Sequence, residues 1–282
     1  MIGVASGKGG TGKTTIAVNL ALYLSKSHTV ALFDLDVEEP NDNHFLQHNL
    51  IYYKDVNLLK PKIDEDLCTH CGLCAELCEF NALAVLPNQV LTFEKLCHSC
   101  GLCSTACPEK AIKEISYNLG VIKRSKGQKD GLVLYEGKLN VGEALATPII
   151  KELKRITFRE KYDYIILDLP PGSACPVIEG LRNTDFVILV TEPTPAGEHD
   201  LLIAIHLVKE MKIPFGIVNN RSDVGDNRIK RITEKKSNKL LLEIPHDNEI
   251  LNLYSNGLPL VGPVNKYDFM FMKLHQMIME NI

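Results

Sequence analysis

The sequence of 282 residues is long enough for one or two domains with a substantial hydrophobic core. Hydrophobic residues make up 45% of the chain and charged residues 23%, proportions that exclude a mainly disordered or fibrous protein. The formal net charge of −4 disfavours general binding to nucleic acid. No apolar run approaches the roughly 18 residues that a membrane-spanning helix needs, and no cleavable leader precedes the first glycine-rich loop. We therefore expect a cytoplasmic protein without stable membrane insertion.

Short apolar runs alternate with helical patterns along most of the chain, which predicts an α/β fold with a doubly wound, mostly parallel sheet. Strands are expected over residues 2–5, 29–33, 164–169, 186–190 and 215–219. Helices are expected over residues 14–24, 141–155, 197–211 and 227–236. Residues 123–129 are predicted to form a basic, solvated loop, with docking of an acidic redox partner as the alternative.

Residues 61–115 interrupt this alternation with a segment rich in cysteine, glycine and acidic side chains. It carries four lysines against eight acidic residues, which accounts for the whole formal net charge of the chain. We predict an inserted domain here, between two parts of one α/β domain formed by residues 1–60 and 116–282. Eight of the nine cysteines lie in the insertion, and in a cytoplasmic chain such cysteines favour metal ligation over disulfides.

The eight cysteines form two runs of identical spacing, C-x2-C-x2-C-x3-C, and the second run is followed by proline. In two-cluster ferredoxins of bacterial type, three closely spaced cysteines hold one [4Fe–4S] cluster and the fourth ligates the other cluster. The predicted ligand sets are therefore Cys68, Cys71, Cys74 and Cys107 for one cluster, and Cys97, Cys100, Cys103 and Cys78 for the second. A structural zinc site would use four cysteines and leave four unexplained. The insertion thus resembles an α+β ferredoxin domain.

Residues 7–14 match the phosphate-binding pattern G-x4-G-K-[ST], as Gly7-Lys8-Gly9-Gly10-Thr11-Gly12-Lys13-Thr14. The match follows a predicted strand and opens a predicted helix, which is the context of an ATP-binding P-loop. Glycines let backbone N–H groups converge on phosphate oxygens at the helix N-terminus. We expect Lys13 to contact the β- and γ-phosphates, Thr14 to ligate Mg²⁺ and Thr15 to contact the α-phosphate.

The lysine at position 8 makes this loop resemble the deviant Walker A motif of the MinD/ParA/Mrp ATPases and the nitrogenase iron protein. In that family the corresponding lysine crosses a dimer interface to the partner's nucleotide. The resemblance implies an ATP-dependent dimer, either a homodimer or a heterodimer with a related paralogue, in which Lys8 contributes to catalysis. The alternative is that Lys8 is a solvated loop lysine.

Two aspartate-containing segments at strand ends resemble the switch regions of the same family. In Asp34-Leu35-Asp36, the resemblance implies that Asp36 orients or deprotonates the attacking water and that Asp34 is a structural partner. In Asp168-Leu169-Pro170-Pro171-Gly172, it implies that Asp168 holds Mg²⁺ through water and that the Gly172 N–H senses the γ-phosphate. The expected fold is therefore that of a P-loop NTPase.

Two later segments resemble the adenine-binding parts of the family. The resemblance implies that Asn220 reads adenine, with Asn219 as the alternative, and that the loop containing Pro245 packs on the base. Cys175 lies seven residues after Asp168 and is expected to be a buried packing residue, with a redox or transient cluster contact as the alternative. The apolar tail at residues 269–279 contains one basic residue, which favours core docking or a dimer contact over a membrane-surface helix.

Three functions are compatible with these motifs. The leading hypothesis is an ATP-hydrolysing dimer switch that gates electron transfer through two [4Fe–4S] clusters to a protein redox partner, with ATP or ADP and Mg²⁺ as the other ligands. The second is an ATPase for assembly or maturation of an iron–sulfur or other metal cofactor. The third is a positioning or partitioning ATPase whose clusters are structural or sensory.

Overall fold

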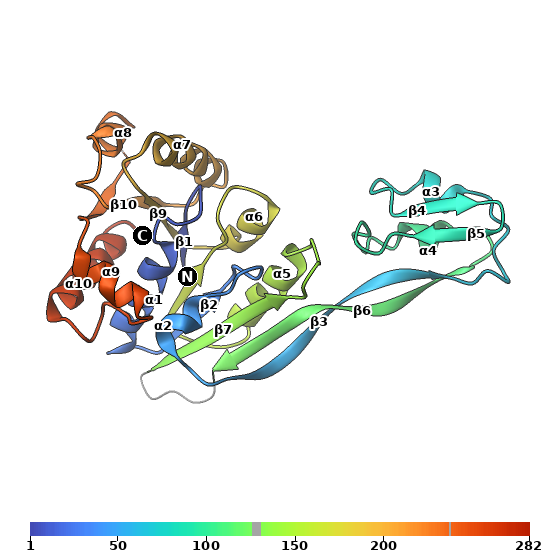
Figure 1. The fold of residues 1–282 in the computed structure, drawn as a ribbon, viewed down its shortest axis with the longest axis horizontal. Helices are drawn as coiled ribbons and strands as arrows, with labels where there is room; N and C mark the ends of the chain where they lie inside the picture. Colours follow the sequence, from blue (N-terminus) through green and yellow to red (C-terminus); the bar gives the residue numbers. More distant parts are fainter. Residues whose placement is uncertain (126–130, 237) are drawn as a thin grey trace. The chain divides into compact units, whose positions relative to one another are not determined.

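The computed structural model describes residues 1–125, 131–236 and 238–282 (Figure 1). The chain divides into two compact units, which are described separately. The first, called the sheet unit, comprises Met1–Tyr53, Ile122–Lys138 and Thr147–Ile282. The second, called the cysteine unit, comprises Lys54–Val121 and Leu139–Ala146. Strands β3 (Leu50–Ile63) and β6 (Ile112–Ser125) run from one unit into the other.

The sheet unit is built on strands whose order in the nine-stranded sheet is β11-β10-β9-β1-β8-β2-β7-β6-β3. All neighbouring pairs from β11 to β7 are parallel. The strands besides β3 and β6 are β1 (Ile2–Ala5), β2 (Val30–Asp34), β7 (Leu132–Leu139), β8 (Tyr164–Asp168), β9 (Phe186–Thr191), β10 (Phe215–Asn220) and β11 (Leu240–Ile244). Every residue of β1, β2 and β9 is buried, as is typical of central strands covered on both faces. The predicted mostly parallel α/β sheet is confirmed.

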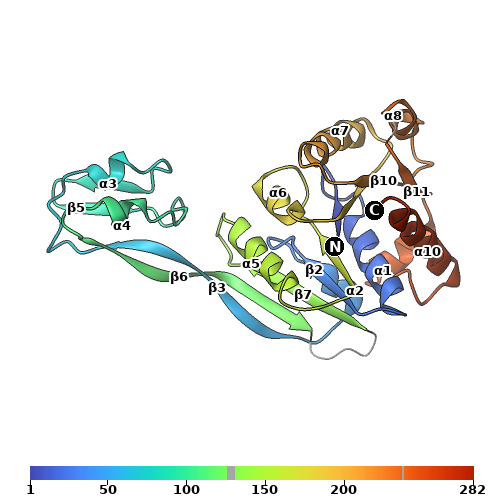
Figure 2. The same cartoon turned by 180° about the vertical axis from the view of Figure 1, so that it is seen from behind.

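Helices cover both faces of this sheet (Figures 1 and 2). One face packs against α1 and α10 around a core that includes Ile2 and Val4 of β1. The other face packs against α6, because a side chain at Gly3 would meet Leu181 of that helix. The helices of this unit are α1 (Lys13–Ser25), α2 (Asp42–Leu46), α5 (Thr147–Thr157), α6 (Cys175–Leu181), α7 (Pro195–Glu210), α8 (Arg228–Lys236), α9 (Asn248–Ser255) and α10 (Asn265–Met279).

The cysteine unit contains two copies of one short structural pattern. Helices α3 (Leu73–Glu76) and α4 (Leu102–Ala106) each begin after a glycine with positive φ, at Gly72 and Gly101. Strands β4 (Leu83–Leu86) and β5 (Gln89–Thr92) pair antiparallel. Left-handed residues repeat at the same 29-residue interval as the glycines and cysteines, at His70 and Ser99 and again at Asn81 and Lys110. The doubled cysteine run therefore corresponds to a doubled backbone conformation.

The segment Leu139–Ala146 joins the cysteine unit through a buried polar cluster. The Tyr117 hydroxyl donates a hydrogen bond to Glu143 Oε1 at 2.6 Å. Lys60 Nζ lies 3.8 Å from Glu143 Oε2 and 3.2 Å from the centroid of the Tyr117 ring. The predicted insertion, residues 61–115, lies inside the limits of this unit, and its definition as a separate ferredoxin domain stays a prediction.

Two expectations about local structure were wrong, and three strands were missed. The helix expected from residue 141 begins only at Thr147, because Gly142 has φ 84° and Pro148 suits the first turn of a helix. Residues 123–125 of the expected basic loop belong to β6, where Lys123 pairs with Glu136 and Arg124 with Glu160. Residues 126–129 of that loop lie outside the described residues. The long strands β3 and β6 and the strand β7 had no counterpart in the sequence prediction.

The C-terminal tail forms α10 and packs into the core of the sheet unit. Its side chains Tyr267, Phe271, Leu274 and Ile278 are buried in the same cluster as α1. Core docking of the tail is therefore confirmed. Among the described residues, no helix combines the length and apolarity needed to cross a membrane.

Candidate functional site

The predicted phosphate-binding loop connects β1 to α1 at the carboxyl ends of the parallel strands. Gly12 precedes α1 with φ 96°, a conformation that residues with a Cβ rarely adopt. Gly7 lies so close to α7 that a Cβ would come within 2.4 Å of the Asp200 carbonyl oxygen. Glycine is therefore required at both positions for the loop to curl over the N-terminus of α1.

A cavity of about 390 Å³ opens beside this loop. The predicted site residues that line it are Gly9, Gly10, Gly12, Lys13, Thr14, Thr15, Asp36, Asn220 and Pro245. Gly7, Lys8, Thr11, Asp168 and Gly172 are not among its lining residues. Nonpolar side chains, including Ile250, Leu251 and Tyr254, cover another part of the cavity. The cavity thus combines a glycine-rich polar loop with an apolar wall, an arrangement that suits a phosphate group joined to an aromatic base.

Thr14 and Asp168, the predicted Mg²⁺ ligands, are in direct contact. The Thr14 hydroxyl donates to Asp168 Oδ2 at 2.7 Å. Asp168 Oδ1 and Thr11 Oγ1 are buried and have no hydrogen-bond partner among the described residues. Burial raises the pKa of Asp168, and the charge of Lys13 opposes this shift. The unpartnered oxygens of Asp168 and Thr11 lie near the buried Lys13. This set of groups suits a hydrated Mg²⁺ ion and a phosphate.

Asp34 and Asp36 end β2 in different environments. Asp34 is buried, and its carboxylate accepts backbone N–H bonds from Asp36, Asn41 and Asp42 at 2.8–3.1 Å. Asp34 therefore shapes the turn after β2, as expected of a structural partner. Asp36 lines the cavity, and burial together with the Asp168 charge raises its pKa to about 6 against the opposing charge of Lys13.

Two acidic side chains near the end of β2 were missed by sequence reasoning. Glu136 of β7 lies in register with Asp34, which in turn lies in register with Asp168, so three carboxylates occupy one row across the sheet. Asp42, the first residue of α2, is fully buried beside this row. Asp42 lies six residues after Asp36 of the expected switch, but nothing in the surrounding sequence signals that its side chain is buried.

Lys8 is paired within its own chain. Its Nζ lies 2.5 Å from Glu192 Oε1, and Arg221 Nη1 lies 3.1 Å from Glu192 Oε2. Burial favours the neutral form of Glu192, but the hydrogen bonds and charges of the two basic residues hold its pKa below the ordinary value. Glu192 follows β9 and was not predicted as a site residue.

The remaining predicted nucleotide contacts have specific partners. The side-chain amide of Asn220 donates to the Thr11 carbonyl at 2.9 Å, so Asn220 bridges β10 and the phosphate loop. Asn219 is buried in the strand and does not line the cavity. The Gly172 N–H donates to the Ser6 carbonyl at 3.0 Å, so sensing of a phosphate by Gly172 requires this bond to break.

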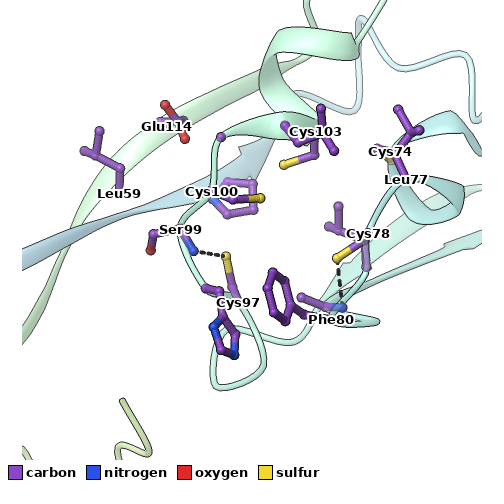
Figure 3. Close-up of a pocket in the computed structure, with 16 residues that line it drawn as sticks. Leu59, Cys74, Leu77, Cys78, Phe80, Cys97, Ser99, Cys100, Cys103 and Glu114 are labelled. Carbon is purple, nitrogen blue, oxygen red and sulfur yellow. Dashed lines mark hydrogen bonds between the residues drawn. The ribbon is translucent and has the colours of Figure 1, made fainter. Parts of the chain in front are cut away.

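In the cysteine unit, eight cysteines line two neighbouring pockets. One pocket is lined by Cys68, Cys71, Cys74 and Cys107. The other is lined by Cys97, Cys100, Cys103 and Cys78, and Cys74 lines this pocket as well. Figure 3 shows the sulfur atoms of the second set directed toward a shared space. The structure therefore brings together each set that the sequence predicts, although iron ligation itself stays a prediction.

Backbone N–H groups point at three of these sulfur atoms. Ala82 donates to Cys78 Sγ and Ala111 donates to Cys107 Sγ, both at 3.3 Å. Ser99 donates to Cys97 Sγ at 3.5 Å. Burial raises the pKa of the Cys103 thiol to about 11, so a bound cation is needed to hold a thiolate there at neutral pH. N–H···S bonds of this kind stabilise ligated thiolates and tune cluster potentials.

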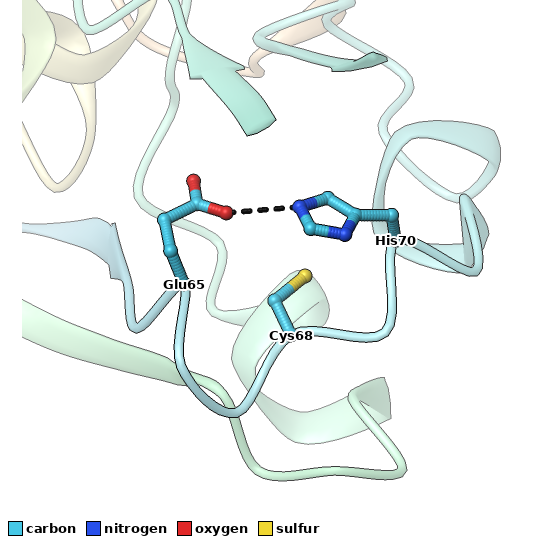
Figure 4. A group of neighbouring side chains, drawn as sticks. All are labelled: Glu65, Cys68 and His70. Carbon is cyan, nitrogen blue, oxygen red and sulfur yellow. Dashed lines mark hydrogen bonds and ion pairs between the residues drawn. The ribbon is translucent and has the colours of Figure 1, made fainter. Parts of the chain in front are cut away.

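Aromatic and ionisable side chains surround the two pockets. The rings of Phe80 and His98 stack with centroids 3.8 Å apart beside the second set of cysteines. His70 Nε2 and Glu65 Oε2 lie 3.0 Å apart next to Cys68, as Figure 4 shows. Glu65 also accepts the Val90 N–H at 3.1 Å. These contacts fix the loops that carry the first and second cysteine runs.

Cys175 is exposed at the start of α6, which overturns the expectation of a buried packing residue. Pro176 follows it in the first turn of the helix, so the side chain precedes the part of α6 that enters the core. The first buried residue of α6 is Val177.

Family membership follows from the match of this sequence to a known family. Residues 2–260 match the family described as CobQ/CobB/MinD/ParA nucleotide binding domain. The chain belongs to this family.

This MinD/ParA-family chain is similar in sequence or in fold to several known proteins. An uncharacterized protein of Methanocaldococcus jannaschii is 32% identical over 288 residues, which cover 100% of this chain and 97% of the relative. An iron–sulfur cluster carrier protein of Pyrococcus abyssi is 24% identical over 276 residues, which cover 92% of this chain and 78% of the relative. Among solved structures, the cell division ATPase MinD of Pyrococcus furiosus is similar in fold, with a TM-score of 0.62 and 21% identity over 99% of this chain and 98% of that one.

These similarities confirm the predicted resemblance and the P-loop NTPase fold. As a MinD/ParA-family member, the chain is a P-loop ATPase, for which a nucleotide and Mg²⁺ are the expected ligands. The unpartnered oxygens of Thr11 and Asp168 fit these ligands. The individual roles predicted for Lys8, Lys13 and Asp36 stay predictions.

The pKa of Asp36 gives a testable pH dependence. A carboxylate that accepts a proton from the attacking water works only when ionised, and the raised pKa of about 6 places its ionisation below neutral pH. We expect kcat/KM for ATP hydrolysis to rise as pH increases through about 6 and to level off above it. The measurement is a pH–rate profile at saturating Mg²⁺, with Asp36→Asn as the variant that loses activity throughout. A level profile through this range would contradict the assignment.

Proposed function

We propose that this chain is a nucleotide-dependent dimer switch that hydrolyses ATP and gates electron transfer through two [4Fe–4S] clusters to a protein redox partner. The observation that carries the proposal is the pairing of two cysteine-lined pockets with a P-loop ATPase unit in one chain. Two clusters exceed what a structural role alone requires, and adjacent clusters of this type exchange single electrons.

Each pocket offers a donor set that suits a [4Fe–4S] cluster. Four soft thiolates surround each space, and three of each set come from one loop that the glycine before α3 or α4 allows to turn tightly. When bound, each cluster would supply a site that accepts and releases one electron. The chain's own contribution is to hold the thiolates, to direct the N–H groups of Ala82, Ala111 and Ser99 at sulfur, and to keep acidic residues around the unit. Negative charge of this kind favours a low potential and a basic partner surface.

In the proposed nucleotide site, the residues of the phosphate loop and of the strand ends have separate roles. The glycines and Thr11 bind phosphate oxygens, and Lys13 neutralises charge on the β- and γ-phosphates. Thr14 and Asp168 hold Mg²⁺, which neutralises phosphate charge when bound. Asp36 accepts the proton of the attacking water, and Asn220 with Pro245 binds the base.

The Lys8–Glu192 pair is proposed to restrain dimer formation. Lys8 can reach a partner's nucleotide only after it leaves Glu192, which Arg221 holds from the other side. The dimer is either a homodimer or a heterodimer with a related paralogue. No nucleic-acid partner is proposed, and the cytoplasm is the proposed location.

Replacing the restraining carboxylate should therefore favour the dimer. An ion pair between partly exposed groups contributes about 1 kcal/mol, so we expect Glu192→Gln to strengthen ATP-dependent dimerisation roughly fivefold. Sedimentation velocity with Mg·ATP measures the dimer constant. Lys8→Ala is the matched variant. It removes both the pairing of Lys8 with Glu192 and the proposed contact of Lys8 with the partner's nucleotide, so it should abolish the dimer. Equal dimer constants for Glu192→Gln and wild type would show that the pair does not restrain Lys8.

The gating itself is tested by the rate of electron release. Anaerobically reduced protein is mixed with a one-electron acceptor, oxidised methyl viologen, in the presence of Mg·ATP or Mg·ADP. We expect the two nucleotides to give different oxidation rates, because only ATP supports the closed dimer. Identical rates with both nucleotides would contradict gating.

A second candidate function is delivery of iron–sulfur clusters to other proteins. The name of the Pyrococcus abyssi relative favours it, and so does the exposure of Cys71 and Cys100 at the surface of the two pockets. In this case a cluster would be cargo, and reconstituted protein should transfer iron to an apo-ferredoxin in the presence of Mg·ATP. Iron that resists chelators and remains bound through repeated reduction would exclude delivery.

A further inference from the structure

Asp42 is a buried acidic side chain that the proposed mechanism leaves unexplained. It is 0% exposed, and neither carboxylate oxygen has a hydrogen-bond partner among the described residues. A buried, unpartnered carboxylate is costly, since an ionised group in a protein interior needs a counter-charge or hydrogen-bond donors. Native structures retain such groups where a ligand or ion supplies the missing partner.

The surroundings of Asp42 show where that partner would lie. Its backbone N–H donates to Asp34 Oδ2 at 3.1 Å, which places the residue at the end of β2. Burial raises the pKa of Asp42, and the acidic side chains of Asp34, Asp168 and Glu136 raise it further. The Asp168 oxygen that is not bonded to Thr14 is also buried and unpartnered. Acidic groups thus gather at this end of the sheet, where the charge of Lys13 acts on Asp168.

We propose that Asp42 is a positioning residue for the Mg²⁺ ion of the nucleotide site and acts by accepting hydrogen bonds from cation-bound water. The inference rests on the proposed nucleotide site. Mg²⁺ releases its water reluctantly and is bound through few carboxylates, so buried acceptors around its water shell strengthen its binding. Asp42 lies beside the predicted ligand Asp168, and its two open oxygens match this requirement.

A purely structural role for Asp42 makes a different prediction. A protonated Asp42 could donate a hydrogen bond to Asp168 and need no cation. Asparagine has the same shape and can donate the same bond through its amide. Asp42→Asn therefore preserves the structural role but removes the negative charge that cation-bound water requires.

The test is binding of Mn²⁺ in the presence of ADP, measured by EPR of free Mn²⁺, and binding of ADP alone in EDTA, measured by calorimetry. We expect Asp42→Asn to weaken Mn²⁺ binding about tenfold or more and to leave ADP binding in EDTA unchanged. The urea midpoint without cation should stay close to the wild-type value, because asparagine keeps the shape of Asp42 and can donate the same hydrogen bond. Asp55→Asn, an exposed change of the same charge, should leave all three values unchanged.

Other outcomes would overturn the inference. Equal Mn²⁺ affinity in Asp42→Asn and Asp55→Asn would show that Asp42 has no role toward the cation. Equal losses of Mn²⁺ and ADP binding would indicate a general defect of the loop. If Asp42→Asn does not fold, Asp42→Ser is measured in the same way. Absence of nucleotide binding in the wild-type chain would refute the proposed function, an outcome distinct from a failure of Asp42 alone.

Discussion

A double variant that carries Cys68→Ala and Cys107→Ala is expected to lose one cluster, whereas Cys68→Ala with Cys78→Ala is expected to lose both. The reason is the crossed assignment, in which the last cysteine of each run lines the pocket of the other run. After anaerobic reconstitution, the first variant should keep about four iron atoms of about eight, and the second should keep almost none. Iron and acid-labile sulfide per chain measure the difference.

The design separates crossed from uncrossed ligation because both variants lack two cysteines. If each run held its own cluster, the result would be reversed: the Cys68/Cys78 variant would keep one cluster and the Cys68/Cys107 variant would keep none. Cys175→Ala is the control, since this exposed cysteine lies in the sheet unit and should leave the iron content unchanged. Full iron in every variant would contradict cysteine-ligated clusters altogether.

Lys13→Ala is expected to lower kcat for ATP hydrolysis by about 100-fold to 1,000-fold while iron content stays at the wild-type value. Lys13 is buried at the start of α1, beside Thr14 and within the electrostatic reach of Asp36 and Asp168. Because the Lys13 ammonium is buried, little water has to be displaced from it when it contacts phosphate oxygens. Loss of that charge removes stabilisation of the transition state and leaves the acidic cluster uncompensated.

The unchanged iron content in Lys13→Ala follows from the division of the chain into two units. Lys13 belongs to the sheet unit and all eight clustered cysteines belong to the cysteine unit. The measurements are phosphate release and iron per chain on the same preparation. Lys26→Ala is a matched control, because the exposed Lys26 follows α1 and pairs with Asp268 of α10 rather than with the site. A large loss of iron in Lys13→Ala would contradict the independence of the two units.

The sequence predicted the elements with strong local signals. Strand β1 and helix α7 are examples: β1 is wholly apolar, and α7, expected over residues 197–211, spans Pro195–Glu210. In the candidate site, the glycine pattern and the three closely spaced cysteines of each run lie on continuous loops, so the sequence predicted which of these residues lie together. The fourth cysteine of each set comes from the other run and was predicted from the ferredoxin pattern.

What the sequence did not predict depends on contacts between distant segments. Strands β3 and β6 have mixed exposed and buried residues, so their hydrophobic pattern resembles neither a central strand nor a helix. The pairing of Lys8 with Glu192 joins residues 184 positions apart. The burial of Asp42 depends on how α2 packs beside β2, and no local pattern of residues encodes it.

The exposure of Cys175 has a similar origin. Its position before Pro176 and Val177 suggests an apolar segment. The buried side of α6 is formed by Val177, Gly180 and Leu181, and Cys175 is not part of it. A single cysteine has no periodicity, so the sequence could not determine which face of the helix it occupies.

Control of the clusters in the cysteine unit by nucleotide in the sheet unit can be measured by EPR. Spectra of anaerobically reduced protein are recorded with and without Mg·ATP, with Lys13→Ala measured in parallel. We expect two interacting [4Fe–4S]⁺ signals whose line shape or reduction potential changes with Mg·ATP in the wild type and does not change in Lys13→Ala. Identical spectra and potentials with and without Mg·ATP in the wild type would contradict control of the clusters by nucleotide.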